Sequence, residues 1–306
     1  MWVTFLQFNV LKSLHFYTFM QECNKIKMQK FEDVIIYLYF CSEDSNIFYW
    51  LKNKVMGKVI SIMNFKGGCA KTTTAVNLAA ALNRMKKRVL VIDIDFQCNA
   101  TNTLRFKPDM GDSIYELFTQ KNVRALPVYA FCKGFDFVPS SKNMKSFNEM
   151  MSGRNRREYI LKKLVDMLRD DYDYIFIDCP PNGGLLNTNA MCAADELIIP
   201  VDCEPYSLHG VVTLMDEIQS VKDDEVNTEL KIMGFLLTRY DAVLSLHKEA
   251  AMLMRDRYPG MVFNAKIRKN TALSKASAQQ KTIFEYDDKT SGAEDYLQLA
   301  REIVKM

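Results

Sequence analysis

The stretch "NFKGGCAKTTTAVN", residues 64–77, decides the fold of this chain. It has the glycines, the lysine and the threonines of a phosphate-binding loop, yet it departs from the usual pattern G-x-x-x-x-G-K-[ST]. Phe65 and Ala70 replace the two glycines of that pattern, and Lys66 is an additional lysine ahead of a central Gly-Gly pair. The loop therefore belongs to an unusual subclass, and the rest of the sequence has to show which one.

A Gly-Gly pair lets the backbone turn tightly and direct successive N–H groups at an anion. A helix starting near Lys71 would add the positive end of its dipole. Lys71 is placed to reach the β- and γ-phosphates of a nucleotide, and the Thr72 hydroxyl to hold a Mg²⁺ ion that bridges them. We therefore predict that ATP and Mg²⁺ bind to Lys66, Gly67, Gly68, Cys69, Ala70, Lys71, Thr72 and Thr73.

The bulk composition is that of a soluble globular protein, with 306 residues, 48% hydrophobic and 25% charged. The formal net charge of +3 is too small to indicate a nucleic-acid partner, so such a partner has to be argued from a local patch. None of the eight cysteines forms a C-x-x-C pair, which argues against zinc ribbons and disulfide scaffolds. A reducing cytoplasm is the expected compartment.

Residues 1–55 differ in composition from the rest of the chain. They contain both tryptophans but no Gly, Pro, Ala or Arg. We interpret them as an N-terminal extension, either a mis-assigned translated leader or an arm that packs its aromatic residues on the core or on a partner. The functional domain is expected to span residues 56–306. No window has the ~18 uninterrupted apolar residues that a membrane span needs.

From residue 56 onward, strand and helix signals alternate. This alternation predicts an α/β fold with a mostly parallel, twisted sheet and helices on both faces. The expected helices are 71–85, 157–170, 208–221 and 292–304. The expected strands are 58–64, 88–95, 135–140, 174–180, 196–202, 232–240 and 262–267.

Carboxylates follow two of the apolar strands. In parallel sheets, ligands bind beyond the carboxyl ends of the strands, which is where Asp93, Asp95 and Asp178 are expected. A carboxylate at the end of a buried strand costs several kcal/mol unless a cation or hydrogen-bond donors compensate it. A metal ion is therefore a natural partner for Asp178.

Six blocks in order resemble the ParA/Soj-type chromosome and plasmid partition ATPases, within the MinD/ParA superfamily. They are "KGGCAKTTT", "VLVIDIDFQCNAT", "DYIFIDCPPNGGLL", "ADELIIPVDCEPYSLHGV", "GFLLTRYD" and the segment from "VFNAKIRKN" to "LQLAREI". The resemblance implies a P-loop NTPase of the signature-lysine class, which accounts for the additional lysine. Ala70 and Cys98 depart from the family pattern, because they stand where it has glycine.

The resemblance also implies roles for single residues. Lys66 would reach across an ATP-sandwich dimer to the partner's phosphates, and Lys71 would be catalytic with it. Asp95 would orient the attacking water and contribute with Thr72 to the metal site. Asp178 would hold Mg²⁺ through water.

Charge placement adds a second predicted activity. Residues 239–281 contain nine Lys or Arg against three acids, a local excess of +6. Such a patch favours contact with a phosphate backbone without sequence reading. In the resembling family this surface binds nucleoid DNA when ATP has joined two subunits, and a ParB-like centromere-binding protein stimulates hydrolysis. The candidate DNA contacts are Arg268, Lys269 and Lys275 in a cytoplasmic, nucleoid-associated protein.

Two alternatives stay open at this point. A MinD-like membrane-associated positioning ATPase shares the loop, but it would carry a C-terminal amphipathic basic helix, and "LQLAREIVKM" shows none. No stable membrane association is therefore expected. A transcriptional repressor with secondary ATPase activity would need a helix-turn-helix extension, which is not visible before Met56.

Overall fold

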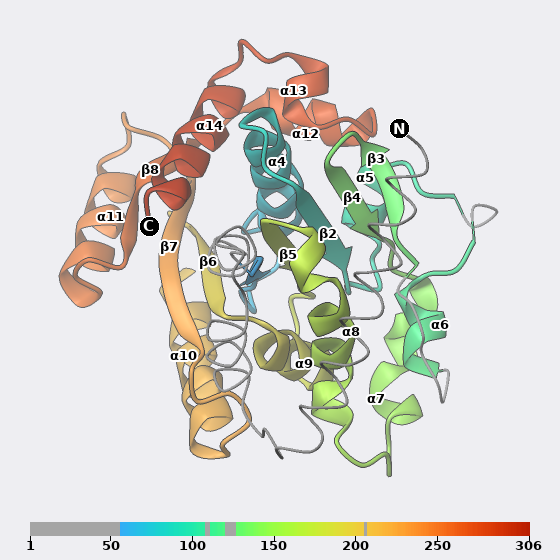
Figure 1. The fold of residues 1–306 in the computed structure, drawn as a ribbon. Coiled ribbons are helices and arrows are strands. Elements are labelled where there is room, and N and C mark those ends of the chain that lie inside the picture. Colours follow the sequence, from blue (N-terminus) through green and yellow to red (C-terminus); the bar gives the residue numbers. More distant parts are fainter. Residues whose placement is uncertain (1–55, 108–110, 120–126, 205–206) are drawn as a thin grey trace, which may run out of the picture. The chain divides into compact units, whose positions relative to one another are not determined.

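The described part of the chain is built on an eight-stranded sheet (Figure 1). The computed structural model describes residues 56–107, 111–119, 127–204 and 207–306, without the side chains of 207–209. The strands are β1 (Lys58–Ile62), β2 (Val89–Asp93), β3 (Tyr129–Cys132), β4 (Phe135–Val138), β5 (Tyr174–Asp178), β6 (Glu196–Asp202), β7 (Lys231–Tyr240) and β8 (Val262–Arg268). Their order is β3-β4-β2-β5-β1-β6-β7-β8, and every neighbouring pair is parallel except β3 and β4.

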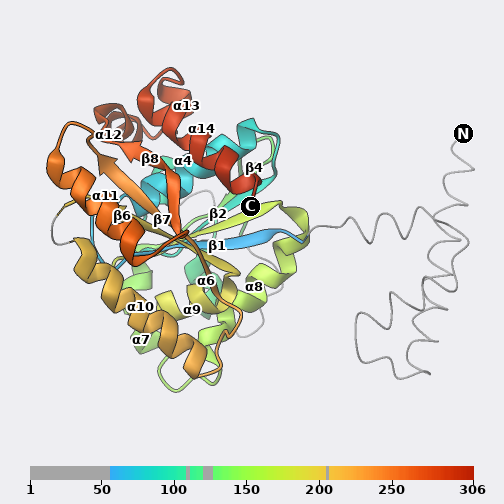
Figure 2. The same ribbon diagram turned by 90° about the vertical axis from the view of Figure 1, so that its left-hand side faces the viewer.

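Helices cover both faces of this sheet (Figure 2). In that view α4, α13 and α14 lie on one side of the strands, and α8, α9 and α10 lie on the other. Short 3₁₀ helices occupy Lys142–Ser146, Arg157–Tyr159 and Arg169–Asp171. The α-helices are α4 (Lys71–Arg84), α5 (Asn99–Thr103), α6 (Ile114–Thr119), α7 (Phe147–Met150), α8 (Ile160–Leu168), α9 (Leu185–Ala193), α10 (Ser207–Asp223), α11 (Ser245–Arg257), α12 (Thr271–Ala278), α13 (Ile283–Tyr286) and α14 (Ser291–Val304).

Strand β5 shows why the central strands are apolar along almost their whole length. Successive side chains of a strand point to opposite faces, and here both faces are buried. Ile175 and Ile177 belong to the core on the side of α8 and α10, together with Leu164. Phe176 belongs to the core formed with α4 and α14. The predicted sheet with helices on both faces is therefore confirmed.

The register of the parallel strands brings the polar ends of three strands to one edge. Asp178 at the end of β5 is the register partner of Ile62 on β1 and of Asp93 on β2. The loop that follows β1 and the carboxylates that follow β2 and β5 therefore meet at the same edge. This is the arrangement that the sequence predicted.

The structure also contains a strand that the sequence pattern did not indicate. Strand β3 pairs antiparallel with β4 at the edge of the sheet, joined through Gly134 at φ 79°. It is only four residues long, its pairing is irregular between Ala130 and Cys132, and none of its side chains is fully buried, unlike those of the central strands. The interpretation of residues 1–55 lies outside the described residues and stays a prediction. Within the described ranges no helix is long and apolar enough to cross a membrane.

Candidate functional site

The loop between β1 and α4 contains two residues in the left-handed backbone region. Gly68 has φ 78°, and Ala70, which is the N-cap of α4, has φ 68° and ψ 31°. Cys98 before α5 has φ 56°. Glycine adopts this conformation freely, whereas a residue with a Cβ atom pays about 1–2 kcal/mol. Ala70 and Cys98 therefore both adopt a backbone conformation that favours glycine.

Buried side chains fix this loop to the neighbouring strands. Asn64 donates from Nδ2 to the Pro200 carbonyl on β6 (2.8 Å), and its Oδ1 accepts the Lys66 N–H (2.9 Å). The Thr238 hydroxyl on β7 donates to the Cys69 carbonyl (3.2 Å). The loop is therefore held by β6 and β7 without help from a ligand.

A cavity of about 610 Å³ lies beside the loop, a volume typical of a small-molecule or cofactor site. One part of its wall comes from the loop and α4, and another from residues 267–274. The wall contains most of the predicted ATP-binding residues, namely Gly67, Gly68, Ala70, Lys71, Thr72 and Thr73, and also Asp95.

The two lysines of the loop extend to different places. Lys71 is buried, lines the cavity, and donates from Nζ to the Lys66 carbonyl at 3.2 Å. The Lys66 ammonium instead pairs with the Glu204 carboxylate, with 3.3 Å between Nζ and Oε2. Among the described residues that form the cavity wall, Lys71 is present and Lys66 is absent.

Cys69 points its side chain into the protein, where the residue is 1% exposed. Its thiol donates to the Lys66 carbonyl (3.2 Å), and burial raises its pKa. A buried thiol with a raised pKa is a poor nucleophile. Any contribution of Cys69 to ligand binding would therefore come from its backbone N–H.

Asp93 and Asp95 have different surroundings. Asp93 accepts the Asp95 N–H (3.0 Å) and both the N–H (2.8 Å) and the hydroxyl (2.6 Å) of Thr101. Burial raises the pKa of Asp93 to about 6, against the lowering effect of the Thr101 hydrogen bonds. Asp95 accepts the Gln97 N–H (2.9 Å) and lines the cavity. Burial also raises the pKa of Asp95, and the hydrogen bond from Gln97 and the charge of Lys71 counteract it. Asp93 thus shapes the loop that presents Asp95.

Asp178 is a buried carboxylate whose oxygens lack a hydrogen-bond partner among the described residues. It is 0% exposed, and no donor in that part of the chain lies within hydrogen-bonding geometry of Oδ1 or Oδ2. Burial raises its pKa well above the usual value and the charge of Asp93 adds to this effect, while the nearby Thr72 hydroxyl lowers it only in part. An unpaired buried carboxylate is expensive, and a cation or an ordered water on a cation would compensate it.

These residues fit a Mg²⁺ ion that arrives with its nucleotide. No cluster of three or more His, Cys, Asp or Glu side chains in the described ranges is arranged to hold a metal by itself. Mg²⁺ commonly uses one or two carboxylates together with phosphate oxygens and waters. The orphaned oxygens of Asp178, with Thr72 and Asp95 in the cavity wall, match that donor set.

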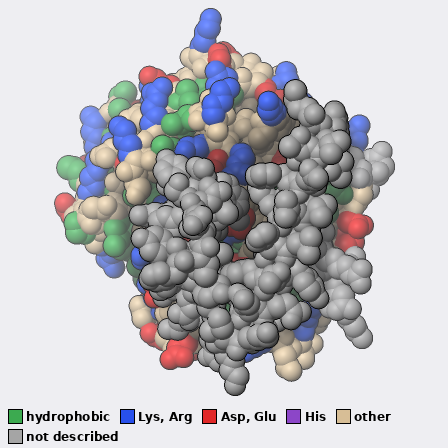
Figure 3. All heavy atoms as spheres, viewed as in Figure 1, with side chains coloured by type: hydrophobic (Ala, Val, Ile, Leu, Met, Phe, Trp, Pro, Cys, Tyr) green, Lys and Arg blue, Asp and Glu red, His purple; other side chains and the backbone are tan. Residues whose placement is uncertain are grey.

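The candidate DNA contacts lie near the same cavity. Arg268 and Lys269 line it, whereas Lys275 is exposed on α12 and is not part of its wall as described. Figure 3 shows Lys and Arg side chains spread over the part of this face where α11–α14 lie. Arg268 is paired with Asp295 and Glu294 (2.6 and 2.7 Å). No ion pair is found for Lys269 or Lys275 among the described residues.

Arg239 is a site residue that the sequence did not single out. Its guanidinium approaches the Gly68 carbonyl (3.5 Å) and pairs with Asp202 (3.3 Å) and Glu204 (3.0 Å). The only signal was its place in "TRYD" at the end of β7, which predicts a location near the ligand edge but no particular contact.

The geometry agrees with the relatives of this chain. Residues 57–232 match a protein family described as "AAA domain". The sporulation initiation inhibitor protein Soj of Bacillus subtilis is 38% identical over 81% of this chain and 98% of its own length. The chromosome partitioning protein ParA of Myxococcus xanthus is 37% identical over 82% and 89%. Among solved structures, a cobyrinic acid a,c-diamide synthase from Mycobacterium smegmatis with bound ADP and magnesium has a TM-score of 0.71 and 29% identity. That similarity covers 82% of this chain and 95% of the synthase chain.

Replacing Ala70 by glycine should stabilise the protein. The left-handed conformation (φ 68°) strains alanine by about 1–2 kcal/mol, and the larger entropy of glycine in the unfolded state offsets about half of this. We expect Ala70→Gly to raise the free energy of unfolding by about 0.5–1 kcal/mol in urea titrations. Ala80→Gly, within helix α4, is the matched control and should lower it. Destabilisation by both substitutions would contradict the strain argument.

Replacing Asp178 by asparagine should separate stability from metal binding. Removing the uncompensated charge should raise the free energy of unfolding of the ligand-free protein at neutral pH by about 1–3 kcal/mol. The same substitution should weaken any stabilisation by Mg²⁺ with nucleotide, measured by thermal unfolding. A variant that is less stable without ligand and still responds fully to Mg²⁺ would show that Asp178 has another role.

Proposed function

This chain belongs to the ParA/Soj family of partition ATPases, and from that membership we propose that it is an ATP-dependent DNA-segregation ATPase. It hydrolyses ATP bound with Mg²⁺ beside the phosphate-binding loop. In the proposed cycle, two ATP-bound copies form a sandwich dimer that binds DNA without sequence preference. Hydrolysis, stimulated by a ParB-like centromere-binding partner, releases the DNA. The protein would act in the cytoplasm on the nucleoid, with residues 56–306 as the functional domain.

The observation that carries this proposal is the different placement of the two loop lysines. Lys71 lies in the wall of its own cavity, where it can neutralise bound phosphate. Lys66 sits five residues earlier in the same loop, but its ammonium extends to Glu204 instead. Lys66 is thus in the phosphate-binding loop but is not among the described residues that line its own cavity. This supports a contact from Lys66 to the phosphates held by the partner subunit.

The free energies of the two contacts favour a move of Lys66 from Glu204 to the phosphates of the partner's ATP. The pair between Lys66 and Glu204 is partly exposed, with side-chain exposures of 28% and 48%. Pairs of this kind contribute about 0–1 kcal/mol. A charge-assisted contact to phosphate contributes on the order of 1.5–3 kcal/mol. Lys66 would therefore leave Glu204 when the partner's ATP arrives, and this links ATP binding to dimerisation.

Hydrolysis would use residues of the cavity wall together with the buried Asp178. Lys71 would neutralise charge on the β- and γ-phosphates, and Asp95 would orient the water that attacks the γ-phosphate in line. Thr72 and Asp178 would hold Mg²⁺, directly and through water. When bound, the ion stabilises negative charge on the phosphate oxygens. The protein supplies positioning and electrostatics, since phosphoryl transfer needs little covalent chemistry from it.

DNA binding would depend on the dimer because two basic surfaces then act together. Each surface includes Lys269 and Lys275, which are exposed and carry no ion pair within the described ranges. Doubling the number of neutralised phosphates raises the affinity and steepens its salt dependence. A dimer can therefore retain DNA that a monomer releases. No observation on the described residues favours the membrane-cycling or repressor alternatives.

Replacing Lys66 by alanine should abolish the ATP-dependent dimer. The two-fold dimer loses two such contacts of about 1.5–3 kcal/mol each, which corresponds to a dimer about a hundred- to ten-thousandfold weaker. Sedimentation velocity with a non-hydrolysable ATP analogue and Mg²⁺ measures this directly. Lys58→Ala is the matched control, because Lys58 is also paired with a glutamate, Glu196 (3.0 Å), but lies at the start of β1. Equal dimerisation of Lys66→Ala and wild type would remove the proposed role.

Replacing Lys275 by glutamine should weaken DNA binding without affecting the nucleotide. Loss of one phosphate contact lowers affinity similarly for all sequences and reduces the slope of log K against log [salt] by about one. ATP affinity should not change, since Lys275 is outside the described cavity wall. Lys162→Gln, on α8, is the control and should leave the slope unchanged. An unchanged slope for Lys275→Gln would show that α12 does not contact DNA through this residue.

A further inference from the structure

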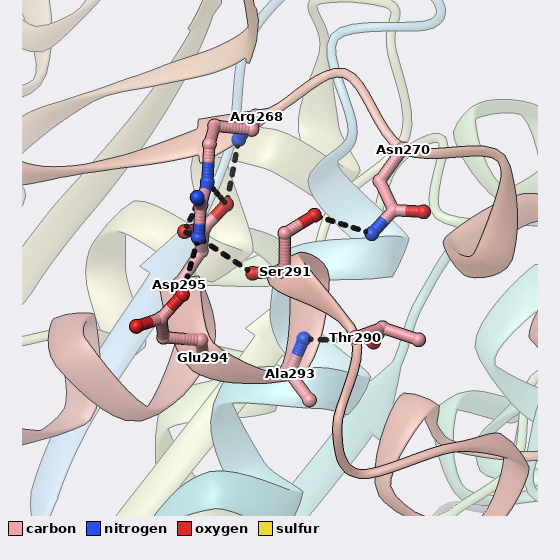
Figure 4. A network of polar contacts seen from close by, with 7 residues as sticks. All are labelled: Arg268, Asn270, Thr290, Ser291, Ala293, Glu294 and Asp295. Atoms are coloured by element: carbon pink, nitrogen blue, oxygen red, sulfur yellow. Dashed lines mark hydrogen bonds and ion pairs between the residues drawn. The ribbon is translucent and has the colours of Figure 1, made fainter.

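Arg268, at the end of β8, is held by two carboxylates at the start of α14 (Figure 4). Its Nε donates to both oxygens of Asp295 (2.9 and 3.1 Å), and its Nη2 lies 2.6 Å from Asp295 Oδ1 and 2.7 Å from Glu294 Oε2. The Asp295 side chain is 4% exposed, whereas that of Glu294 is 74% exposed. The buried Asp295 is therefore the main anchor.

The backbone beside Arg268 is tied to the same helix. The Arg268 N–H donates to Asp295 Oδ2 (2.8 Å), and Asn270 donates from Nδ2 to the Ser291 hydroxyl (2.9 Å). Asn270 also accepts the Ala272 N–H (2.8 Å) as the N-cap of α12. A Cβ atom on Gly292 would lie 2.9 Å from the Leu273 side chain, so α14 and α12 are in close contact. Residues 268–271 are thus fixed to α14 at several points.

This fixed segment is part of the cavity wall. Arg268, Lys269, Asn270 and Thr271 all line the cavity that the phosphate-binding loop lines elsewhere. The phosphates of a nucleotide belong at the loop and Lys71, where N–H groups and a helix N-terminus converge. The rest of the wall is then open to the ribose and the base, and it includes residues 267–274 together with Gln97, Asn99, Thr103, Ser277, Lys281 and Tyr296.

The charge of Arg268 is used within the protein. Its pKa is raised by the hydrogen bonds that it donates to Asp295 and Glu294, which stabilise the cation. Two anions face one cation, so this cluster has no net positive charge to attract DNA. Lys269 and Lys275, which carry no ion pair among the described residues, differ from Arg268 in this respect.

We infer that Arg268 is a positioning residue of the nucleotide site, which acts through its clamp with Asp295, and that it is not a phosphate-contacting residue for DNA. The clamp fixes residues 268–271 where the base and ribose of a nucleoside triphosphate bind. The inference depends on the proposed ATP site.

The test compares Arg268→Gln, Asp295→Asn and the double variant in steady-state ATP hydrolysis with Mg²⁺. Loosening the wall should raise KM for ATP about three- to tenfold, because the ligand must then order a mobile segment. The value of kcat should stay within about twofold, since Lys71 and Asp95 belong to other elements. The double variant should be no worse than either single one, because both remove the same pair. Arg84→Gln, which breaks the exposed pair with Asp288 (3.1 Å) outside the described cavity wall, should leave KM unchanged.

Asp295 is buried, so the substitution Asp295→Asn could reduce folding. Glu294→Gln therefore provides a milder second probe. It removes only the exposed arm of the clamp and should raise KM less than Arg268→Gln does. Unchanged KM values for Arg268→Gln and Glu294→Gln, with ATP binding lost in Lys71→Ala, would overturn the clamp and leave the ATP site standing. ATP binding by Lys71→Ala equal to wild type would overturn both.

DNA binding distinguishes the two roles of Arg268 through its salt dependence. If Arg268 contacted phosphate directly, Arg268→Gln would reduce the slope of log K against log [salt] by about one. The inference predicts that Arg268→Gln leaves this slope unchanged. A slope reduced by about one in Arg268→Gln would overturn the inference.

Discussion

A buried, unpaired carboxylate is the constraint on which the ligand edge of this protein depends. Asp178 ends β5 with no exposure and no hydrogen-bond partner within the described ranges, next in register to Asp93, which is also buried. A fold keeps such a group only where something else compensates it, since the charge costs several kcal/mol. Lys71 and Thr72 moderate its pKa from within the chain, but only in part. In the proposed function a cation compensates this charge, and a nucleotide held at the adjacent loop is the means by which Mg²⁺ would arrive.

The basic residues around this edge differ in the groups that their positive charges contact. Lys71 faces the cavity, Arg239 joins the loop to Asp202 and Glu204, and Arg268 is neutralised by Asp295 and Glu294. Lys66 is held by a partly exposed pair that is weak enough to be exchanged. Lys275 is exposed with no ion pair within the described ranges. In the proposed cycle these differences separate phosphate neutralisation, dimerisation, positioning and DNA contact.

The sequence predicted the central sheet and the phosphate-binding loop because their signals are local. Strands such as β5 are apolar runs bounded by polar residues, and the loop is a short motif between a strand and a helix. Other features depend on contacts that are distant in sequence. Arg268 was predicted to contact DNA from its charge alone, and its partner Asp295 lies 27 residues away on another element. The orphaned oxygens of Asp178 follow from burial in three dimensions, although the strand-end position did indicate a cation site. Strand β3 has too few residues to produce a periodic signal.

The pH dependence of stability tests most directly whether bound metal compensates the buried carboxylates. Burial raises the pKa of Asp178 and Asp93 in the folded state, so the folded protein retains protons that the unfolded chain has released. Without ligand, the free energy of unfolding should therefore fall as pH rises from about 5 to about 8. Saturating Mg²⁺ with ADP should remove most of that fall, because the cation stabilises the ionised carboxylates, whereas ADP with EDTA should not. The same pH slope in all three conditions would contradict the account.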